Sequence, residues 1–313
     1  MLWVYRINVT NKTSKNFVKY MQSCHLASCL IVIILTEQKA SYKPFLRWAG
    51  GKNWLIKYLP AMVSDLDFNT YYEPFFGGGS VFFNLNPKRA KLSDANFELV
   101  ETYRAVQEDV EKVLEQLALW QVNEDQYYAV RTMSSSDLFV RAARFIYLNR
   151  TSFNGIYRVN RKGEYNVPYG HKDGYQFDEE RIRGASRALQ GKKVFHSDFA
   201  EALRSVEPGD LVFLDPPYTV AHNNNGFIEY NKNLFSLEDQ IKLRQCIDEL
   251  ASKGAYFILT NAAHEKILEI FGGCGDKVEL SRFSCLGGKQ AKREIITEYV
   301  FSNIPDWRTR EML

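Results

Sequence analysis

One short motif joins a carboxylate to two prolines and an aromatic ring: Asp215, Pro216, Pro217 and Tyr218. It follows the apolar run 211–214, which is typical of a buried strand. The prolines restrict the backbone, so the carboxylate and the next carbonyl project together from the end of that strand. Two fixed acceptors suit an NH2 group and favour the tetrahedral geometry in which an exocyclic amino nitrogen attacks. The tyrosine ring can stack on a base, whereas an ordinary surface turn is the alternative.

A second group of residues forms a glycine loop after another strand-like segment. Phe75 and Phe76 are followed by Gly77, Gly78 and Gly79. Glycines allow the backbone to approach a ligand closely. A dinucleotide fingerprint would need a further glycine where Phe82 stands, so this loop does not fit a pyrophosphate. It suits a nucleoside without phosphates, with a plain strand-to-helix turn as the alternative.

Asp94 stands at the end of the next strand-like segment, 91–93. An acidic side chain at this place can accept hydrogen bonds from ribose hydroxyls. The alternative is that Asp94 caps a helix that begins at 96–99.

The segment 45–52 ends in Gly-Gly-Lys but is not a phosphate-binding loop. Leu46 and Asn53 stand where that loop needs a glycine and a serine or threonine. Trp48 and Lys52 can instead offer an aromatic wall and a cation to a ligand that carries a carboxylate. A capped helix start with a buried tryptophan explains the segment equally well.

The elements that must position these groups alternate between strand and helix. Strands are predicted at 70–72, 91–93, 193–196, 210–214 and 255–260. The clearest helix begins at Ser236, has Asp239 in the capping-box position, and stops at Gly254. Between 97 and 180 the pattern changes to helices over 97–120 and 137–148, followed by a stretch rich in Gly, Asn, Arg and aromatic residues. That block is predicted to be an insertion into an α/β sheet.

Composition fits a globular protein with a sizeable core. The chain has 313 residues, 45% of them apolar, and a net charge of +3. No apolar run reaches about 18 residues, so no membrane span is predicted. Five scattered cysteines without a C-x-x-C pair indicate reduced thiols in a cytoplasmic protein. Residues 1–40 differ from the rest and are interpreted as an atypical N-terminal extension, because their apolar run 26–35 is a poor match to a secretory signal.

The inserted stretch is locally basic. Six Lys or Arg residues stand between 144 and 172 against one acid, Glu164, a local charge of +5 that would attract phosphates. Phe153, Tyr157 and Tyr165 alternate with these cations. The Asn-Gly pair at 154–155 and the Lys-Gly pair at 162–163 are predicted to be turns of a hairpin that can enter a DNA groove. An ordinary solvated hairpin is the alternative.

Six motifs occur together in order: FLRWAGGK, EPFFGGGSVFFN, LSDAN, LNRTSFNGIYRVNRKGEYNVPYG, FLDPPY and YFILTN. The set, over about residues 43–304, resembles the alpha group of the Dam-like D12 class of DNA adenine-N6 methyltransferases. The resemblance implies a Rossmann-like α/β sheet that binds S-adenosylmethionine, formed by 41–96 and 181–313. It also implies a mainly helical target-recognition domain with a β-hairpin, formed by 97–180.

The resemblance also assigns roles to residues. It implies that the methyl-donor site is formed by Trp48, Lys52, Phe75, Gly77, Gly79, Asp94, Asp198, Phe199 and Asp215. Of these, Asp198 and Phe199 would contact the donor's adenine. Phe153 and Asn154 would lie near the target pair, and Ile156, Arg158 and Pro168 would face bases. Arg47 stands where relatives often have a lysine that contacts the outer guanine, a departure that affects the exact site.

The implied reaction is direct methyl transfer to a flipped adenine in double-stranded DNA, in GATC or a similar short site. No metal or cysteine nucleophile is required. A cytosine carbon-5 enzyme is excluded because none of the five cysteines follows a proline. Cytosine-N4 and RNA-adenine methylation remain as alternatives, as does a catalytically silent DNA-binding homologue. The sequence leaves open the oligomeric state and whether a cognate restriction endonuclease exists.

Overall fold

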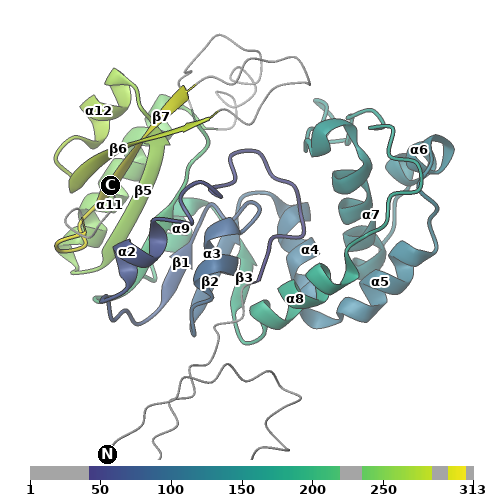
Figure 1. Cartoon of the computed structure of the whole chain (residues 1–313), viewed down its shortest axis with the longest axis horizontal. Coiled ribbons are helices and arrows are strands. Elements are labelled where there is room, and N and C mark those ends of the chain that lie inside the picture. The colour runs from purple at the N-terminus through teal and green to yellow at the C-terminus, as the bar shows by residue number, and fades with distance from the viewer. Residues whose placement is uncertain (1–41, 219–234, 284–294, 308–313) are drawn as a thin grey trace, which may run out of the picture. The chain divides into compact units, whose positions relative to one another are not determined.

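The computed structural model describes residues 42–218, 235–283 and 295–307, so the predicted extension 1–40 lies outside the described residues. Its centre is a seven-stranded sheet in the order β3-β2-β1-β4-β5-β7-β6 (Figure 1). The strands are β1 Tyr71–Glu73, β2 Ala90–Asp94, β3 Lys193–His196, β4 Leu211–Leu214, β5 Tyr256–Ala262, β6 Asp276–Phe283 and β7 Ile295–Ser302. The mixed α/β fold predicted from the sequence is confirmed.

The direction of the strands sets where a ligand can bind. β3, β2, β1, β4 and β5 are parallel to one another, and β7 runs antiparallel between β5 and β6. From β1 the chain moves outward to β2 and β3 on one side and to β4 and β5 on the other. In such sheets ligands bind beyond the carboxyl ends of the strands where the order reverses. Here that point lies between β1 and β4.

Both faces of the sheet are buried, because successive strand residues point to opposite sides. Tyr71, Leu211 and Phe213 pack in one core cluster with helices α2 Leu59–Val63 and α3 Ser80–Leu85. Tyr72, Val212 and Leu214 pack in a second cluster. That second face is covered by α9 Phe199–Leu203, α11 Leu237–Ser252 and α12 Glu265–Phe271.

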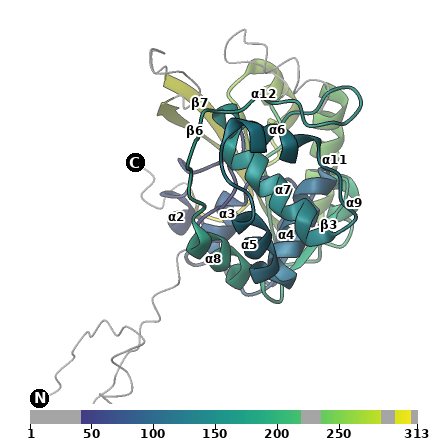
Figure 2. The same ribbon diagram turned by 90° about the vertical axis from the view of Figure 1, so that its right-hand side faces the viewer.

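A helical block lies between β2 and β3 in the chain and beside the sheet (Figures 1 and 2). It contains α4 Phe97–Glu108, α5 Val110–Ala118, α6 Glu124–Thr132, α7 Leu138–Thr151, the 3-10 turn η1 Phe153–Gly155 and α8 Glu179–Leu189. Side chains from the block belong to the same core cluster as α2 and α3. Residues 41–313 form one compact unit, and the division into catalytic and recognition domains stays a prediction.

Local signals placed most of these elements correctly. The five predicted strands are confirmed within two residues, and α11 has the capping box between Ser236 and Asp239. The predicted helical run 97–120 is broken into two helices at Asp109, whose extended backbone ends α4 and whose side chain caps α5. The predicted hairpin is only partly present. Asn154 and Gly155 belong to η1, whereas the turn at 160–164 closes a short pair of arms joined by the isolated bridge between Val159 and Tyr165.

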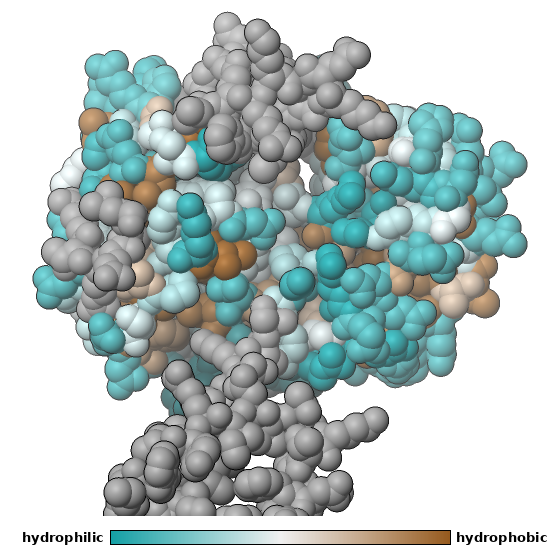
Figure 3. Space-filling view, in the orientation of Figure 1, coloured by the Kyte–Doolittle hydropathy of each residue, from teal (hydrophilic) through white to brown (hydrophobic). Residues whose placement is uncertain are grey.

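No helix in the described ranges is long and apolar enough to cross a membrane. The face seen in Figure 3 is largely hydrophilic over the helical block, with hydrophobic residues only in small patches. Cys246 and Cys274, the two cysteines within the described ranges, are free thiols.

Candidate active site

The ends of β1 and β4 bring two of the predicted motifs together. β1 and β4 are adjacent and parallel, with Tyr71 opposite Leu211 and Tyr72 opposite Val212. The glycine loop leaves the end of β1, and Asp215 immediately follows β4. Because parallel strands end at the same edge of a sheet, both motifs lie at the point where the strand order reverses.

Asp215 is held by two neighbours through one of its two oxygens. The Lys52 ammonium lies 2.7 Å from Oδ1, and the Thr260 hydroxyl donates to the same oxygen at 2.9 Å. Lys52 is 3% exposed and also donates to the Gly50 carbonyl. The Asp215 side chain keeps 17% of its surface exposed, and no donor in the described ranges is bound to Oδ2. Among the described residues, Oδ2 is therefore the oxygen that can accept hydrogen bonds from a ligand.

Burial is the main cause of the pKa shifts of two carboxyl groups at this edge, those of Asp215 and Glu73. Burial raises the pKa of the Asp215 carboxyl above its ordinary value, while the Lys52 ammonium and the Thr260 hydroxyl offset part of that rise. Glu73, at the end of β1, is 3% exposed and accepts a hydrogen bond from Tyr71 at 2.8 Å. Burial raises the pKa of Glu73 well above its ordinary value; the Tyr71 hydrogen bond offsets part of this, and the charge of Asp215 adds to it. Sequence reasoning quoted Glu73 within a motif but gave it no role.

The glycine loop is held tightly against Trp48. Gly77 has a φ of +48°, and a Cβ there would lie 2.7 Å from Trp48 Cδ1. Only glycine combines that backbone with that contact without strain. The Gly77 carbonyl accepts from the Tyr103 hydroxyl at 3.0 Å, and Gly79 has a φ of +68°. Trp48 and the loop therefore form one wall, and their sharing of a ligand stays a prediction.

Asp94 is anchored to the same loop. Its Oδ2 accepts from the Gly77 N–H at 2.8 Å and its Oδ1 accepts from the Asn96 N–H at 2.9 Å. Burial raises the pKa of Asp94, and these two backbone hydrogen bonds oppose the rise. The cap of α4 is Asn96, whose side chain accepts from Leu99, so the interpretation of Asp94 as the cap was wrong.

Aromatic rings line the next part of the sheet edge. Phe75 stacks on Phe199 with ring centroids 5.4 Å apart and meets Phe235 edge-on at 5.6 Å. Asp198 caps α9 by accepting from Ala200 and pairs with Lys242 at 3.2 Å. Asp198 thus already has a local structural role. Phe199 is 5% exposed, so the half-buried Phe75 is the ring of this pair that a ligand can reach.

The segment 42–53 connects the sheet edge to the helical block. The Arg47 backbone exchanges two hydrogen bonds with the buried amide of Asn149 on α7, at 2.8 and 2.7 Å. Trp48 stacks on Phe145 and on Tyr157, with centroids 6.3 and 5.6 Å apart. The position of Trp48 beside the glycine loop therefore depends on contacts with α7 that no local sequence signal indicates.

Comparison with known proteins identifies the family. A model of the D12 class N6 adenine-specific DNA methyltransferases matches residues 48–281. The chain belongs to this class of DNA adenine methyltransferases. The resemblance stated from the six motifs is confirmed.

Several curated proteins are similar over most of this methyltransferase. The Type II methyltransferase M1.LlaDCHI of Lactococcus lactis subsp. cremoris is 35% identical over 86% of this chain and 98% of its own length. The Type II methyltransferase M.MjaIII of Methanocaldococcus jannaschii is 36% identical over 70% of this chain and 84% of its own. A DNA adenine methylase of Haemophilus influenzae is 31% identical over 76% of this chain and 85% of its own.

The residues predicted to contact DNA in this methyltransferase follow α7. Phe153 is 53% exposed, and its N–H donates to the Pro168 carbonyl at 2.9 Å. Asn154 is exposed with a φ of +56°, and Ile156 is half-buried. Arg158 precedes the 160–164 turn, and its guanidinium donates to the Asn166 side chain at 2.8 Å across the two arms. The exposed Arg47 lies beside this stretch, because a Cβ added at Gly155 would be 2.5 Å from Arg47 Cδ.

The basic stretch is less available to phosphates than its charge suggested. Arg144 points inward, donating to the carbonyls of Val130 and Arg131 and lying 3.7 Å from Glu98. Arg150 donates to the Tyr175 hydroxyl. From the sequence, Arg144 was predicted to be one of six cations that attract phosphates. That was wrong for Arg144, because its guanidinium is bound within the helical block by two carbonyls and Glu98.

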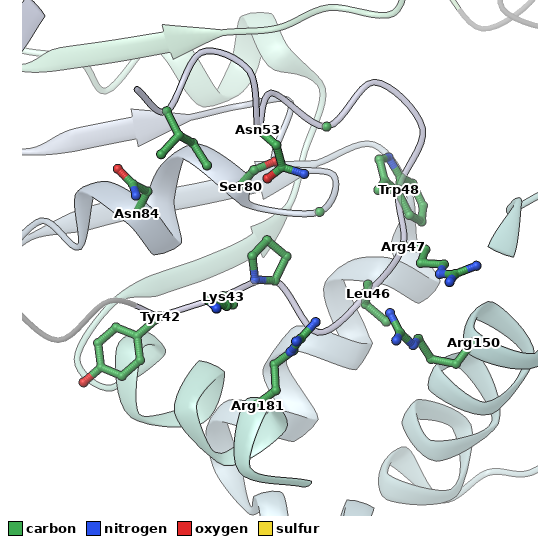
Figure 4. A pocket seen from close by; sticks show the side chains of 14 residues that line it. Tyr42, Lys43, Leu46, Arg47, Trp48, Asn53, Ser80, Asn84, Arg150 and Arg181 are labelled. Carbon is green, nitrogen blue, oxygen red and sulfur yellow. The ribbon is translucent and has the colours of Figure 1, made fainter. Parts of the chain in front are cut away.

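A cavity of about 550 Å³ is lined on one side by the segment 42–53 (Figure 4). Arg150 and Arg181 reach toward it from α7 and α8, and Lys43 and Arg47 border it from the segment itself. None of its described lining residues carries a carboxylate. The cavity is therefore lined by cations, of which Arg181 is paired with Asp178 at 3.0 Å and Arg47 is a predicted DNA-contacting residue.

Proposed function

We propose that this adenine methyltransferase transfers the methyl group of S-adenosylmethionine to N6 of an adenine flipped out of duplex DNA, within GATC or a similar short site. The observation that carries the proposal is Asp215 at the switch point of the sheet. One of its oxygens is fixed by Lys52 and Thr260, and the other is left for an amino group. The DNA adenine methylase named among the similar proteins supports an adenine target.

The residues at the sheet edge fit this methyl donor. Lys52 has three N–H groups and uses two of them, on Asp215 and Gly50, so one remains for a carboxylate. Asp94 accepts two backbone hydrogen bonds and has further lone pairs for ribose hydroxyls. The half-buried ring of Phe75, backed by Phe199, suits an adenine. When bound, S-adenosylmethionine supplies an electrophilic methyl group on a sulfonium.

The protein's own residues then act on the target base. Asp215 Oδ2 and the Pro216 carbonyl accept the two amino hydrogens, which directs the nitrogen lone pair out of conjugation with the ring. Pro217 keeps that turn rigid, and Tyr218 stacks on the base. Asp215 stays ionised beside Lys52, so that the amino group meets a full negative charge as it becomes positive.

We assign residues 41–96 and 181–313 to the catalytic domain and 97–180 to target recognition. Phe153, Asn154, Ile156, Arg158 and Pro168 form the proposed base-reading face, with Arg47 beside it. The cations around the cavity of Figure 4 support binding of the DNA backbone. The described ranges hold no group of three His, Cys, Asp or Glu side chains that could bind a metal ion.

The proposal is tested by expressing the protein in a host that lacks adenine methylation and sequencing plasmid DNA for modified bases. N6-methyladenine in one short motif is expected. N4-methylcytosine instead would contradict the adenine target. If plasmid is unmodified while calorimetry shows binding of the donor and of duplex, the protein would be a silent DNA-binding homologue.

Replacing Thr260 by Val tests the electrostatics of Asp215. The change removes the hydroxyl that favours the carboxylate and keeps the side-chain volume. Because this hydroxyl lowers a pKa that burial has raised, its loss should raise the pKa of Asp215 further. Protonated Asp215 no longer presents a charged acceptor to its amino hydrogen, so the acid limb of kcat/KM for T260V should move to higher pH. An acid limb that stays in place, or moves to lower pH, would show that Asp215 does not control it.

Replacing Arg158 by Ala separates base reading from phosphate binding. Its guanidinium is held by Asn166 and is exposed, which suits a bidentate contact to guanine. R158A should lower discrimination at one base pair by about 1–3 kcal/mol. The control K172A should weaken binding to all sequences alike and reduce the salt dependence. The measurement is the methylation rate on oligonucleotides substituted one pair at a time. A uniform loss for R158A would mean that Arg158 holds a phosphate.

A further inference from the structure

Glu298 is a fully buried carboxylate that reaches the catalytic motif from β7, which is separated from β4 by β5. It lies on β7, is 0% exposed, and pairs in register with Ala262 of β5 and Leu280 of β6. Its Oε2 accepts a hydrogen bond from the hydroxyl of Tyr218.

The other oxygen of Glu298 is also occupied. Arg282, on β6 and diagonal to Glu298 in the register, donates to Oε1 at 2.6 Å. The carboxylate is therefore divided between one cation and the phenol of Tyr218, with neither oxygen left unpaired. The Lys52 ammonium, which pairs with Asp215, lies 4.9 Å from the centroid of the Tyr218 ring.

Burying such a charge is costly. An apolar pair of the same volume is often as stable as a buried ion pair, or more so. A bidentate Arg282–Glu298 pair would also satisfy both partners without Tyr218. The arrangement instead ties the hydroxyl of the last residue of the catalytic motif to a strand that is antiparallel to its neighbours. Its consequence is a fixed orientation of the Tyr218 ring.

We propose that Glu298 is a positioning residue that acts through Tyr218. Its charge-assisted hydrogen bond fixes the ring plane against the target adenine and increases the electron density of the ring. The inference rests on the proposed function. As the adenine amino nitrogen attacks the methyl group, positive charge develops on the base, and an electron-rich ring face stabilises that charge. Because Glu298 is 0% exposed and bonded to Tyr218, it acts through the ring, and its effect is expected on the chemical step more than on binding.

A double-mutant cycle measures this coupling. Glu298→Gln keeps the volume and a hydrogen bond but removes the charge, and Tyr218→Phe removes only the hydroxyl. Each single variant should lower the single-turnover rate about ten-fold, with KM for DNA and donor affinity changed less than about three-fold. The double variant should lose no more than Tyr218→Phe alone, because both changes remove the same interaction. Losses that multiply would overturn the proposal.

The control is Glu279→Gln, which removes the same charge from β6. Glu279 is exposed and pairs with Lys277, so its variant should keep the wild-type rate. A second readout uses 2-aminopurine at the target position, whose fluorescence is quenched by stacking. The Glu298→Gln complex should be brighter than wild type and the Glu279→Gln complex should not. Equal brightness of all three complexes would count against the proposal.

Folding is checked by thermal melting. If Glu298→Gln does not fold, Tyr218→Phe still tests the hydrogen bond from the other side, because the Glu298–Arg282 pair stays intact; a near wild-type rate for that variant overturns the inference. The wild-type reaction is measured first. Its absence overturns the proposed function and the inference with it, whereas an active wild type with two unimpaired single variants overturns only the role of Glu298.

Discussion

Replacing Asp215 by Ala is expected to abolish methyl transfer while the protein stays folded and still binds duplex DNA. The carboxylate is the acceptor that should act on the amino group in the transition state, so its loss removes an interaction that DNA binding does not need. A fall of about 10³-fold or more in the single-turnover rate is expected. Donor affinity should also fall, because Lys52 loses its partner at 2.7 Å.

Two further variants make this result specific. Asp215→Asn keeps the volume and removes the charge, and it should lose nearly as much activity as Asp215→Ala. Asp248→Asn removes a surface carboxylate that pairs with Arg244 on α11, and it should leave the rate unchanged. A near wild-type rate for either Asp215 variant would show that methyl transfer does not need the Asp215 carboxylate as an acceptor.

Replacing Gly77 by Ala is expected to lower the affinity for S-adenosylmethionine at least ten-fold, or about 1.4 kcal/mol. The added Cβ would meet Trp48 at 2.7 Å, on a backbone whose φ of +48° disfavours any side chain. Trp48 is packed against Phe145 and Tyr157 and cannot move aside without losing those contacts. The change therefore deforms the proposed donor site, and isothermal calorimetry with the purified protein measures the loss.

Gly191→Ala is the matched control. Gly191 has a φ of +72° but no atom within 4 Å of an added Cβ, and it lies between α8 and β3. Both variants should lower the free energy of unfolding by about 1–2 kcal/mol through backbone strain. Only G77A should weaken donor binding. Equal donor affinity in the two variants would show that the glycine loop is not part of the donor site.

Much of this protein was determined by local sequence. Strands β1 to β5 follow from short apolar runs, and α11 from its capping box and terminal glycine, because these preferences act over a few residues. Asp215 and the glycine loop were found for the same reason, since each directly follows a buried strand. The parallel order of those strands then implied that they share one edge of the sheet. The six motifs added the family, which the comparison confirms.

Other features were decided by contacts between segments far apart in the chain. β6 and β7 were not predicted, and with them Glu298 was missed, because a single buried glutamate in an apolar run has no local signature. Thr260 belongs to a quoted motif, but only the pairing of β5 with β4 brings its hydroxyl to Asp215. Arg144 was counted as available to phosphates, but in the folded chain its guanidinium contacts α6 and Glu98. Local sequence determines which residues lie at the ends of elements, whereas the partners of a buried charge depend on which elements the folded chain packs against it.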